Sequence, residues 1–132
     1  MSMPALDLFS TFVQLGAGGT AAPVPWTPDF WRRLSVAEGD RVVGAKHGRE
    51  PGDFHPAEWE VHPHGEELLL VLSGALDVIL DSPDGERTIS LTAGGACLVP
   101  RGVWHRLTMH QPSDLLFVTP PSGTRLRPLG AR

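Results

Sequence analysis

Apolar and polar residues alternate in short runs along most of the chain, and this pattern predicts β-strands rather than long helices. The clearest example is LDVILD at residues 76–81, which a turn sequence, SPDG, separates from the alternating residues ERTISL. Such a pair predicts a β-hairpin. Strands are predicted in the same way over residues 41–46, 58–64, 67–73, 76–81, 88–92, 96–99, 105–110 and 115–119. Short strands at this spacing are typical of a sandwich or a small barrel.

The beginning of the chain has a weaker pattern. Phe12 to Leu15 form a short apolar piece, which we interpret as an early strand, and the glycines and prolines of residues 16–25 predict a flexible arm after it. The sequence TPD at residues 27–29 is typical of a helix start, because proline fits the first helical position. We therefore expect one or two helical turns over residues 29–34.

The composition supports one all-β domain. A chain of 132 residues is long enough for one domain with a hydrophobic core and short for two. Its 15 glycines, 13 prolines and 20% charged residues predict frequent turns and few long amphipathic helices. We therefore predict a single domain over residues 1–132, with a barrel over about residues 40–120 after an N-terminal arm of residues 1–39.

Charge and hydropathy exclude several classes of partner. A net charge of -4 argues against binding to a nucleic-acid backbone, which requires a basic patch. No apolar run approaches the roughly 20 residues of a membrane-spanning helix, and MSMPALDLFS at the N-terminus lacks the features of a signal peptide. Cys97 is the only cysteine, so no internal disulfide can form. We expect a cytoplasmic protein with no nucleic-acid or membrane partner.

Candidate chemistry is concentrated in residues 59–74, WEVHPHGEELLLVLSG. Five potential metal ligands precede or begin an apolar strand in this stretch: Glu60, His62, His64, Glu66 and Glu67. In an extended strand Glu60, His62 and His64 share one face. Charged groups beside a core strand are costly unless they are paired, and a metal cation can hold carboxylates and imidazoles together there. The stretch therefore predicts half of a metal site.

A second informative stretch is GGACLVPRGVWH at residues 94–105. It has the spacing G-x5-P-x-G-x2-H, which ends at His105, while the first stretch fits E-x-H-x4-E-x6-G from Glu60 to Gly74. In this order, about 20 residues apart, the two stretches resemble the two motifs of the cupin superfamily. The resemblance covers about residues 40–120. It implies an all-β cupin jelly-roll β-barrel, here with the short N-terminal arm and the short helix.

The resemblance also implies a ligand set. Carried over by position, Glu60 takes the place of the usual first histidine, and His62, Glu67 and His105 match the other ligands, so these four residues are expected to bind one metal. The chain departs from the family pattern at Glu60, at Met109, where the second motif often ends in Asn, and at Phe54, where the first often begins with Gly.

The ligand register has an alternative. His62-Pro63-His64 is also H-x-H, but it leaves only two residues before Glu67, whereas the cupin spacing needs three or four. Counting back from Gly74 favours Glu60 and His62 and places His64 at the rim. The sequence leaves open whether His64 is the metal ligand in place of Glu60, and whether Glu66 is the ligand in place of Glu67.

Two imidazoles and two carboxylates form a harder ligand set than three histidines, and they suit Mn, Fe, Zn or Ni better than Cu(I). Mn or Fe is preferred for catalysis because six-coordination leaves open positions. A bound metal of this kind polarises an oxygen of the substrate or lowers the pKa of a bound water. Glu60 is the candidate catalytic residue, since a carboxylate displaced from the metal can serve as a general base.

We therefore expect a metal-dependent enzyme that acts on a small oxygenated organic molecule. By resemblance it is a dioxygenase or other oxidoreductase, an isomerase, a decarboxylase or a cyclase, and the sequence does not choose among them. The alternative is a non-catalytic module that binds or senses a small molecule. The resemblance also implies a homodimer, in which the strand at residues 12–15 either joins the partner's sheet or packs on its own barrel.

Overall fold

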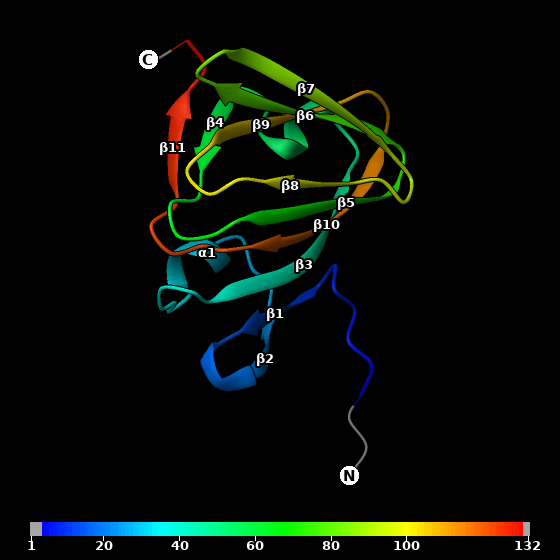
Figure 1. Cartoon of the computed structure of the whole chain (residues 1–132). Helices are drawn as coiled ribbons and strands as arrows, with labels where there is room; N and C mark the ends of the chain where they lie inside the picture. Colours follow the sequence, from blue (N-terminus) through cyan, green and yellow to red (C-terminus); the bar gives the residue numbers. More distant parts are fainter. Residues whose placement is uncertain (1–3, 131–132) are drawn as a thin grey trace.

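Two antiparallel β-sheets face each other in the computed structural model, which describes residues 4–130 (Figure 1). The predicted domain of residues 1–132 extends beyond the described part by three residues at the N-terminus and two at the C-terminus. The start of the MSMPALDLFS segment, on which the expectation about a signal peptide partly rests, also lies outside the described residues. Within residues 4–130, no helix is long and apolar enough to cross a membrane.

The larger sheet has six strands in the order β2-β1-β3-β10-β5-β8. Their bounds are β1 Thr11–Leu15, β2 Ala21–Pro25, β3 Arg41–Gly48, β5 Glu67–Ser73, β8 Ala96–Val99 and β10 Ser113–Thr119. Alternating segments and, for β5, a continuous apolar run between turn signals predicted these strands from β3 onward. In the structure one face of each strand is buried. In β5, for example, Leu69 and Val71 are buried while Leu72 is exposed.

The smaller sheet has five strands in the order β11-β4-β9-β6-β7. Their bounds are β4 Glu58–Val61, β6 Ala75–Ser82, β7 Gly85–Thr92, β9 Trp104–Met109 and β11 Arg125–Pro128. The predicted hairpin is confirmed as β6 and β7, which pair along their whole length from Ala75 opposite Thr92 to Ser82 opposite Gly85. Gly74, with a φ of 94°, connects β5 to β6 in a conformation that favours glycine.

The hydrophobic core lies between the two sheets. It contains buried side chains from both: Phe12, Val42, Leu69, Val71, Leu76, Val78, Leu80, Leu91, Val99, Leu115 and Phe117. This arrangement is the predicted cupin jelly roll, so the fold class is confirmed. The prediction of a barrel needs one correction, because the strands remain in two separate hydrogen-bonded sheets that do not close into a continuous ring.

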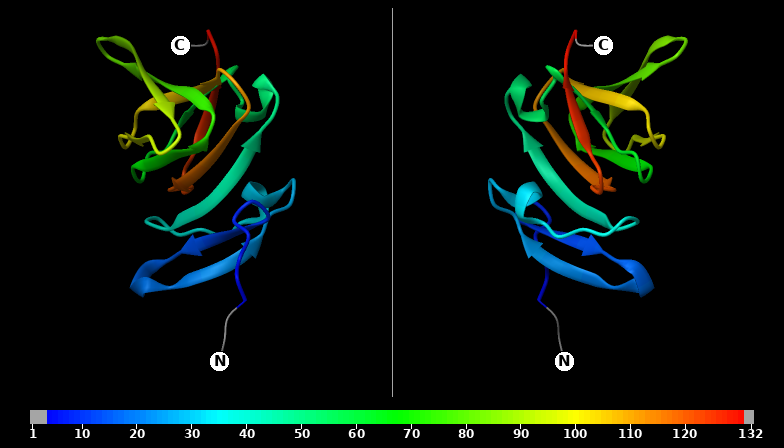
Figure 2. Two further views of the ribbon diagram at one scale, coloured as in Figure 1. Left: turned by 90° about the vertical axis from the view of Figure 1, so that its right-hand side faces the viewer. Right: turned by 90° about the vertical axis from the view of Figure 1, so that its left-hand side faces the viewer.

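The N-terminal region is more ordered than the prediction of a flexible arm. β1 pairs with β2 on one side and with β3 of the same chain on the other, so this hairpin extends the six-stranded sheet (Figure 2). The prediction was wrong over β2 because Pro23 and Pro25 suggested a loop, whereas proline is compatible with an edge strand. The predicted short helix is confirmed as α1, Phe30–Arg33, whose Phe30 packs edge-on against Phe12.

The remaining differences between the predicted and the observed elements lie in short segments between strands. Two 3-10 turns, η1 at Ala17–Gly19 and η2 at Pro51–Phe54, lie between strands. The strand predicted over residues 58–64 ends at Val61, because Pro63 lacks an N–H donor and the chain turns toward β5. The carbonyl of His62 instead accepts a hydrogen bond from the backbone of Gly102 at 3.0 Å. This contact ties the segment after β4 to the loop before β9.

Candidate metal centre

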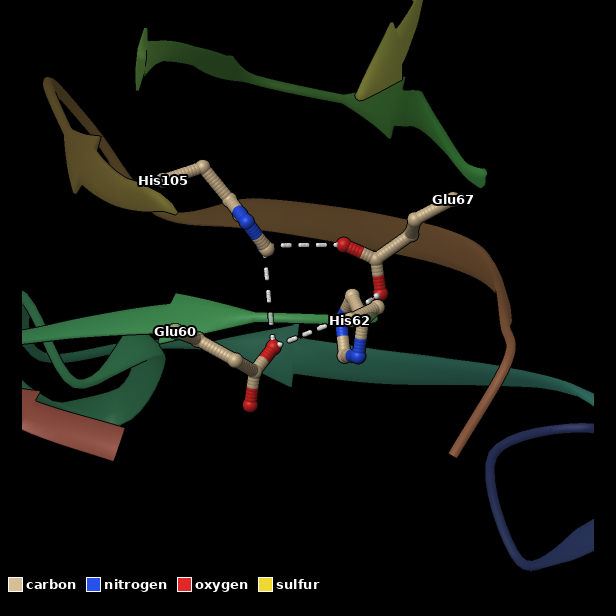
Figure 3. Close-up of side chains that lie close together, drawn as sticks. All are labelled: Glu60, His62, Glu67 and His105. Atoms are coloured by element: carbon tan, nitrogen blue, oxygen red, sulfur yellow. Dashed lines mark ion pairs between the residues drawn. The ribbon is translucent and has the colours of Figure 1, made fainter. Parts of the chain in front are cut away.

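Four side chains converge between the two sheets at one end of the core (Figure 3). Glu60 lies on β4 directly opposite His105 on β9. His62 follows the end of β4, and Glu67 is the first residue of β5 in the facing sheet. The short turn from β4 to β5 carries the chain from one sheet to the other, and it thereby brings His62 and Glu67 to the same point.

The distances describe a compact cluster. One potential ligand atom from each of the four side chains lies within 4.8 Å of the others. His62 Nε2 is 3.0 Å from Glu60 Oε1 and 3.3 Å from Glu67 Oε2. His105 Nε2 is 3.0 Å from Glu67 Oε1 and 3.6 Å from Glu60 Oε1. The structure therefore brings together all four residues that the sequence motifs predicted to share a site.

The two alternative ligands lie elsewhere. His64 is half-exposed, and its Nδ1 is 3.4 Å from Glu38 Oε1, away from the cluster. Glu66 is exposed, although its neighbour Glu67 is buried. The geometry thus matches the register that was counted back from Gly74. It places His64 at the rim, as the cupin spacing implied.

Burial divides the cluster into a closed part and an open part. His62, Glu67 and His105 have relative exposures of only 2–4%. The side chain of Glu60 is 38% exposed and borders a cavity. Three groups are therefore held in an apolar surrounding, and Glu60 faces the space that a ligand can enter.

Two hydroxyl groups support the cluster from outside. Thr119, at the end of β10, donates a hydrogen bond of 2.6 Å to Glu67 Oε2. Thr124 Oγ1 lies 2.8 Å from His62 Nδ1. When the neutral imidazole donates its Nδ1 hydrogen to Thr124, the lone pair of Nε2 points into the cluster, as a metal ligand requires. Neither threonine belongs to a motif that the sequence revealed.

The charged groups of the cluster strongly affect the protonation of His62 and Glu67. Burial lowers the pKa of His62, but the carboxylates of Glu60 and Glu67 outweigh burial and raise this pKa from 6.5 to about 9. Burial raises the pKa of Glu67, but His105 and His62 outweigh it and lower this pKa from 4.5 to about 2. A protonated His62 between two carboxylates therefore supplies the positive charge that a metal ion also supplies.

The donor set fits a divalent metal. Although carboxylate oxygens lie 3.0 Å and 3.3 Å from His62 Nε2, this buried nitrogen has no hydrogen-bond partner of adequate geometry within residues 4–130. When a cation takes the place of the Nε2 proton of His62, the lone pair of this nitrogen faces the centre of the group. Two imidazole nitrogens and two carboxylates suit first-row divalent ions. Glu60, His62, Glu67 and His105 are the residues that can hold such an ion.

A cavity of about 600 Å³ extends from the cluster. Its walls are mainly apolar, with side chains from both sheets and from η2: Phe54, Leu69, Leu107, Leu115 and Phe117. Trp31 of α1 also borders it and is 46% exposed. A volume of this size is typical of sites for small organic molecules.

Comparison with known protein families gives one match. A family model described as "Cupin domain" matches residues 48–119, a segment that contains the whole cluster. No curated protein sequence matches the chain at a significant level.

Solved structures are similar to this chain at low sequence identity. A cupin-2 domain containing protein from Shewanella frigidimarina is 21% identical, with a TM-score of 0.49 over 72% of this chain and 80% of that chain. HppE, crystallised with CoII and its substrate, is 20% identical, with a TM-score of 0.50 over 60% of this chain and 44% of that chain. Oxalate decarboxylase from Bacillus subtilis is 18% identical, with a TM-score of 0.51 over 67% of this chain and 23% of that chain. The match thus spans less than half of the length of the last two proteins.

Proposed function

The chain belongs to the Cupin domain family, whose model covers residues 48–119, and on this premise we propose that it is a metal-dependent enzyme acting on a small oxygenated organic molecule. The observation that carries the proposal is the convergence of Glu60, His62, Glu67 and His105 at one end of a cavity of about 600 Å³. A cluster buried in this way can hold one divalent ion, and the cavity gives a substrate access to it.

In this proposal Glu60, His62, Glu67 and His105 are the metal ligands, with Mn or Fe preferred over Zn or Ni. When bound, the metal supplies Lewis-acid polarisation of a substrate oxygen or lowers the pKa of a bound water. Thr124 fixes the imidazole of His62 so that Nε2 faces the centre, and Thr119 fixes one carboxylate oxygen of Glu67. The protein thus holds the ligand atoms in place before a metal arrives.

Glu60 is the proposed catalytic base. Its carboxylate is the most exposed of the four groups, and it borders the cavity, so it can accept a proton from a bound molecule. Glu67 is buried and receives hydrogen bonding from Thr119, so it is better placed to remain a fixed negative charge. The apolar walls at Leu69 and Phe117 exclude water from a bound substrate.

The reaction type stays open among dioxygenation or other oxidation, isomerisation, decarboxylation and cyclisation. The likeness to HppE and to oxalate decarboxylase is a likeness of fold at 18–20% identity, and it does not select one of these reactions. The classification as an oxidoreductase and the cytoplasmic location therefore remain predictions.

The second candidate function is a non-catalytic module that binds a small molecule. The two functions differ in the access of water to the metal, and relaxation of water protons by Mn(II)-loaded protein measures this access. Because Glu60 is 38% exposed at the cavity, we expect strong relaxation enhancement from exchangeable water on the metal. Relaxation no greater than that of a fully coordinated Mn(II) chelate contradicts the enzyme proposal and favours a closed binding site.

A homodimer is also part of this proposal, and the outer face of the six-stranded sheet supports it. The register places apolar residues of neighbouring strands side by side on this face: Leu68, Leu70, Ala96, Leu98, Leu116 and Val118. Leu98 is 64% exposed, although an outer face is normally polar. We expect light scattering to give a dimer mass, and Leu98→Lys to give a monomer; a monomeric wild-type protein contradicts this part of the proposal.

A further inference from the structure

Lys46 on β3 is the only lysine in the chain, and its side chain borders the same cavity as the metal cluster. Its orientation follows from the register of the sheet. Lys46 pairs with Leu115 of β10, which in turn pairs with Val71 of β5, and both of these apolar side chains are buried in the core. Lys46 is therefore a cation on the inner face of the sheet, in one row with two buried apolar side chains.

The ammonium group of Lys46 has little compensation from the protein. It donates a hydrogen bond to the backbone carbonyl of Asp53 and lies 5.8 Å from the centroid of the Phe54 ring. The carboxylate of Asp53 instead accepts hydrogen bonds from the backbone N–H groups of Arg49 and Glu50, at 2.8 Å and 2.9 Å. Within residues 4–130, Lys46 forms no ion pair with a carboxylate. At least one of its three N–H donors remains for a ligand.

This position is unfavourable for an unpaired charge. Burial lowers the pKa of Lys46, and the charge of Asp53 only partly opposes that effect. A cation that is removed from water without a counter-ion costs free energy. An anionic group in the cavity would lower that cost.

Lys46 and the residues that contact the metal cluster lie on the same face of the six-stranded sheet. Three rows of inward side chains cross β3, β10 and β5, with Lys46 in the first row and Phe117 and Leu69 in the second. The third row contains Thr119, which donates its hydrogen bond to Glu67. The first and third rows are four residues apart along each strand, or about 13 Å at the usual rise of a β-strand. An apolar band therefore separates the cation from the metal ligands.

We propose that Lys46 anchors the carboxylate of the substrate, and that the substrate class is a monocarboxylate with an aromatic or aliphatic body. This inference rests on the proposed function, because it assigns the other end of the same molecule to the metal cluster. The apolar body lies along Phe117 and Leu69, and its oxygenated end reaches Glu60. A carboxylate fits better than a phosphate dianion, because a single ammonium offers few donors and Glu60 and Glu67 disfavour a second negative charge.

Other cations at the cavity are less suited to this task. Arg32 of α1 borders the cavity but is exposed to solvent. Arg106 has a buried Nε without a partner within residues 4–130, but it follows His105 directly on β9, next to the metal cluster rather than across the apolar band from it. Lys46 is therefore the anchor that the geometry favours.

The single lysine makes a direct test possible. Reductive methylation with ¹³C-formaldehyde keeps the positive charge of Lys46 and leaves it one N–H donor, and it labels only Lys46 and the N-terminal amine, so NMR observes each separately. Metal-free and Zn(II)-loaded protein are each titrated with 3-phenylpropionate and with its neutral amide. We expect the Lys46 signal to shift saturably with the carboxylate and not with the amide, while the N-terminal signal stays constant. No saturable shift, or equal shifts with both compounds, overturns the proposal.

Calorimetry of unlabelled variants provides the second arm. Lys46→Met is expected to weaken binding of 3-phenylpropionate by about tenfold or more, as for the loss of a hydrogen bond to a charged group. Arg49→Gln is the matched control, because Arg49 is a nearby cation that pairs with Asp114 outside the cavity, and it is expected to leave binding unchanged. Loss of binding in Arg32→Gln but not in Lys46→Met overturns the proposal by placing the anchor on α1.

The two proposals can fail separately. Carboxylate binding to metal-free protein depends on Lys46 and the apolar walls, whereas metal binding depends on the cluster of Glu60, His62, Glu67 and His105. If the protein binds metal but no carboxylate, only the proposed substrate class is contradicted. If the protein binds the carboxylate through Lys46 but binds no metal, the proposed function is contradicted, and the role of Lys46 as the anchor is supported.

Discussion

The two ends of the cavity carry charges of opposite sign. At one end, the carboxylates of Glu60 and Glu67 meet His62 and His105 at distances of 3.0–3.6 Å, so the group attracts a cation. At the other end, the ammonium of Lys46 contacts a carbonyl and an aromatic ring, so it attracts an anion. Charged groups in apolar surroundings are stable only with partners. The opposite charges therefore indicate how a bound molecule is oriented: its anionic group lies at Lys46, and its other end lies at the metal cluster.

The ends also differ in how firmly they are held. Glu67 and His62 each have a hydroxyl partner, from Thr119 and Thr124, which fixes the orientation of the side chain. Lys46 has a long flexible side chain and one backbone acceptor. A rigid end suits a metal that requires fixed geometry, whereas a flexible end suits ligands of different lengths.

The largest expected effect at the rigid end is the loss of Glu67. Glu67→Gln removes a buried negative charge that contacts both histidines, and we expect affinity for Mn(II) or Zn(II) to fall by at least about 100-fold, more than for loss of an outer partner of a ligand. Competition with a chromophoric chelator measures the affinity. Glu66→Gln is the control, because Glu66 is exposed and lies next in sequence. Equal affinities for the two variants would contradict the assignment of Glu67.

The ion pairs of the rigid end also predict the pH dependence of the metal-free protein. The pKa of His62 is raised to about 9, so its contribution to stability is complete below pH 6.5 and is lost as the pH rises through 9. The pKa of Glu67 is lowered to about 2, so its contribution is complete above pH 4.5 and is lost as the pH falls through 2. The two groups share one cluster, so we expect a combined change of about 2–3 kcal/mol on either side.

Urea denaturation of chelator-treated protein between pH 2 and pH 9.5 tests this expectation. The free energy of unfolding should be highest between pH 4.5 and pH 6.5 and should fall toward pH 9. In His62→Gln the decrease on the alkaline side should disappear. A decrease of unchanged size in that variant would assign the pH dependence to other groups.

Loss of the hydroxyl partners is expected to have a smaller effect. Thr124→Val removes the partner of His62 Nδ1 while keeping the shape of the side chain, and we expect metal affinity to fall by about tenfold. Titration calorimetry with Zn(II) measures it. Thr88→Val, on the exposed side of β7, is the matched control and should leave affinity unchanged. An unchanged affinity in Thr124→Val would show that Thr124 does not position His62.

The smallest effect is expected at the flexible end. Lys46→Met removes an incompletely paired charge from an apolar wall, so the ligand-free protein should become more stable by about 1 kcal/mol, with metal affinity unchanged. Thermal unfolding measures the change. A destabilised variant would mean that the hydrogen bond to Asp53 outweighs the cost of the charge, and the contrast between the two ends would then be weaker.

Most of the fold was predictable because the strands from β3 to β10 are alternating or short apolar segments between clear turns. β6 and β7 are the best case, with a full hairpin register. The exceptions have physical reasons. β2 contains Pro23 and Pro25, which sequence reasoning assigns to loops, and it forms a strand only because it lies at the edge of a sheet. β11 is only four residues long, and its Leu126 is 58% exposed, so it has no buried apolar face that a pattern could reveal.

The site was predictable to the extent that motif spacing determines it. The spacing from Glu60 to Gly74 and the position of His105 together selected the four residues that converge in the structure. Thr119 and Thr124 were missed, because a hydroxyl that supports a ligand has no spacing of its own and depends on how distant segments pack. Lys46 was missed for a similar reason, since only the register of β3 against β10 directs it into the cavity.

Metal content measured by elemental analysis tests the central claim most directly. The protein is purified without added metal, then loaded with Mn(II) or Fe(II) under anaerobic conditions and desalted. We predict about one ion per chain for the wild type and for His64→Ala, whose side chain lies at the rim, and almost none for His62→Ala and His105→Ala. Unchanged content in both of the latter variants, or a loss confined to His64→Ala, would contradict the assignment of the site.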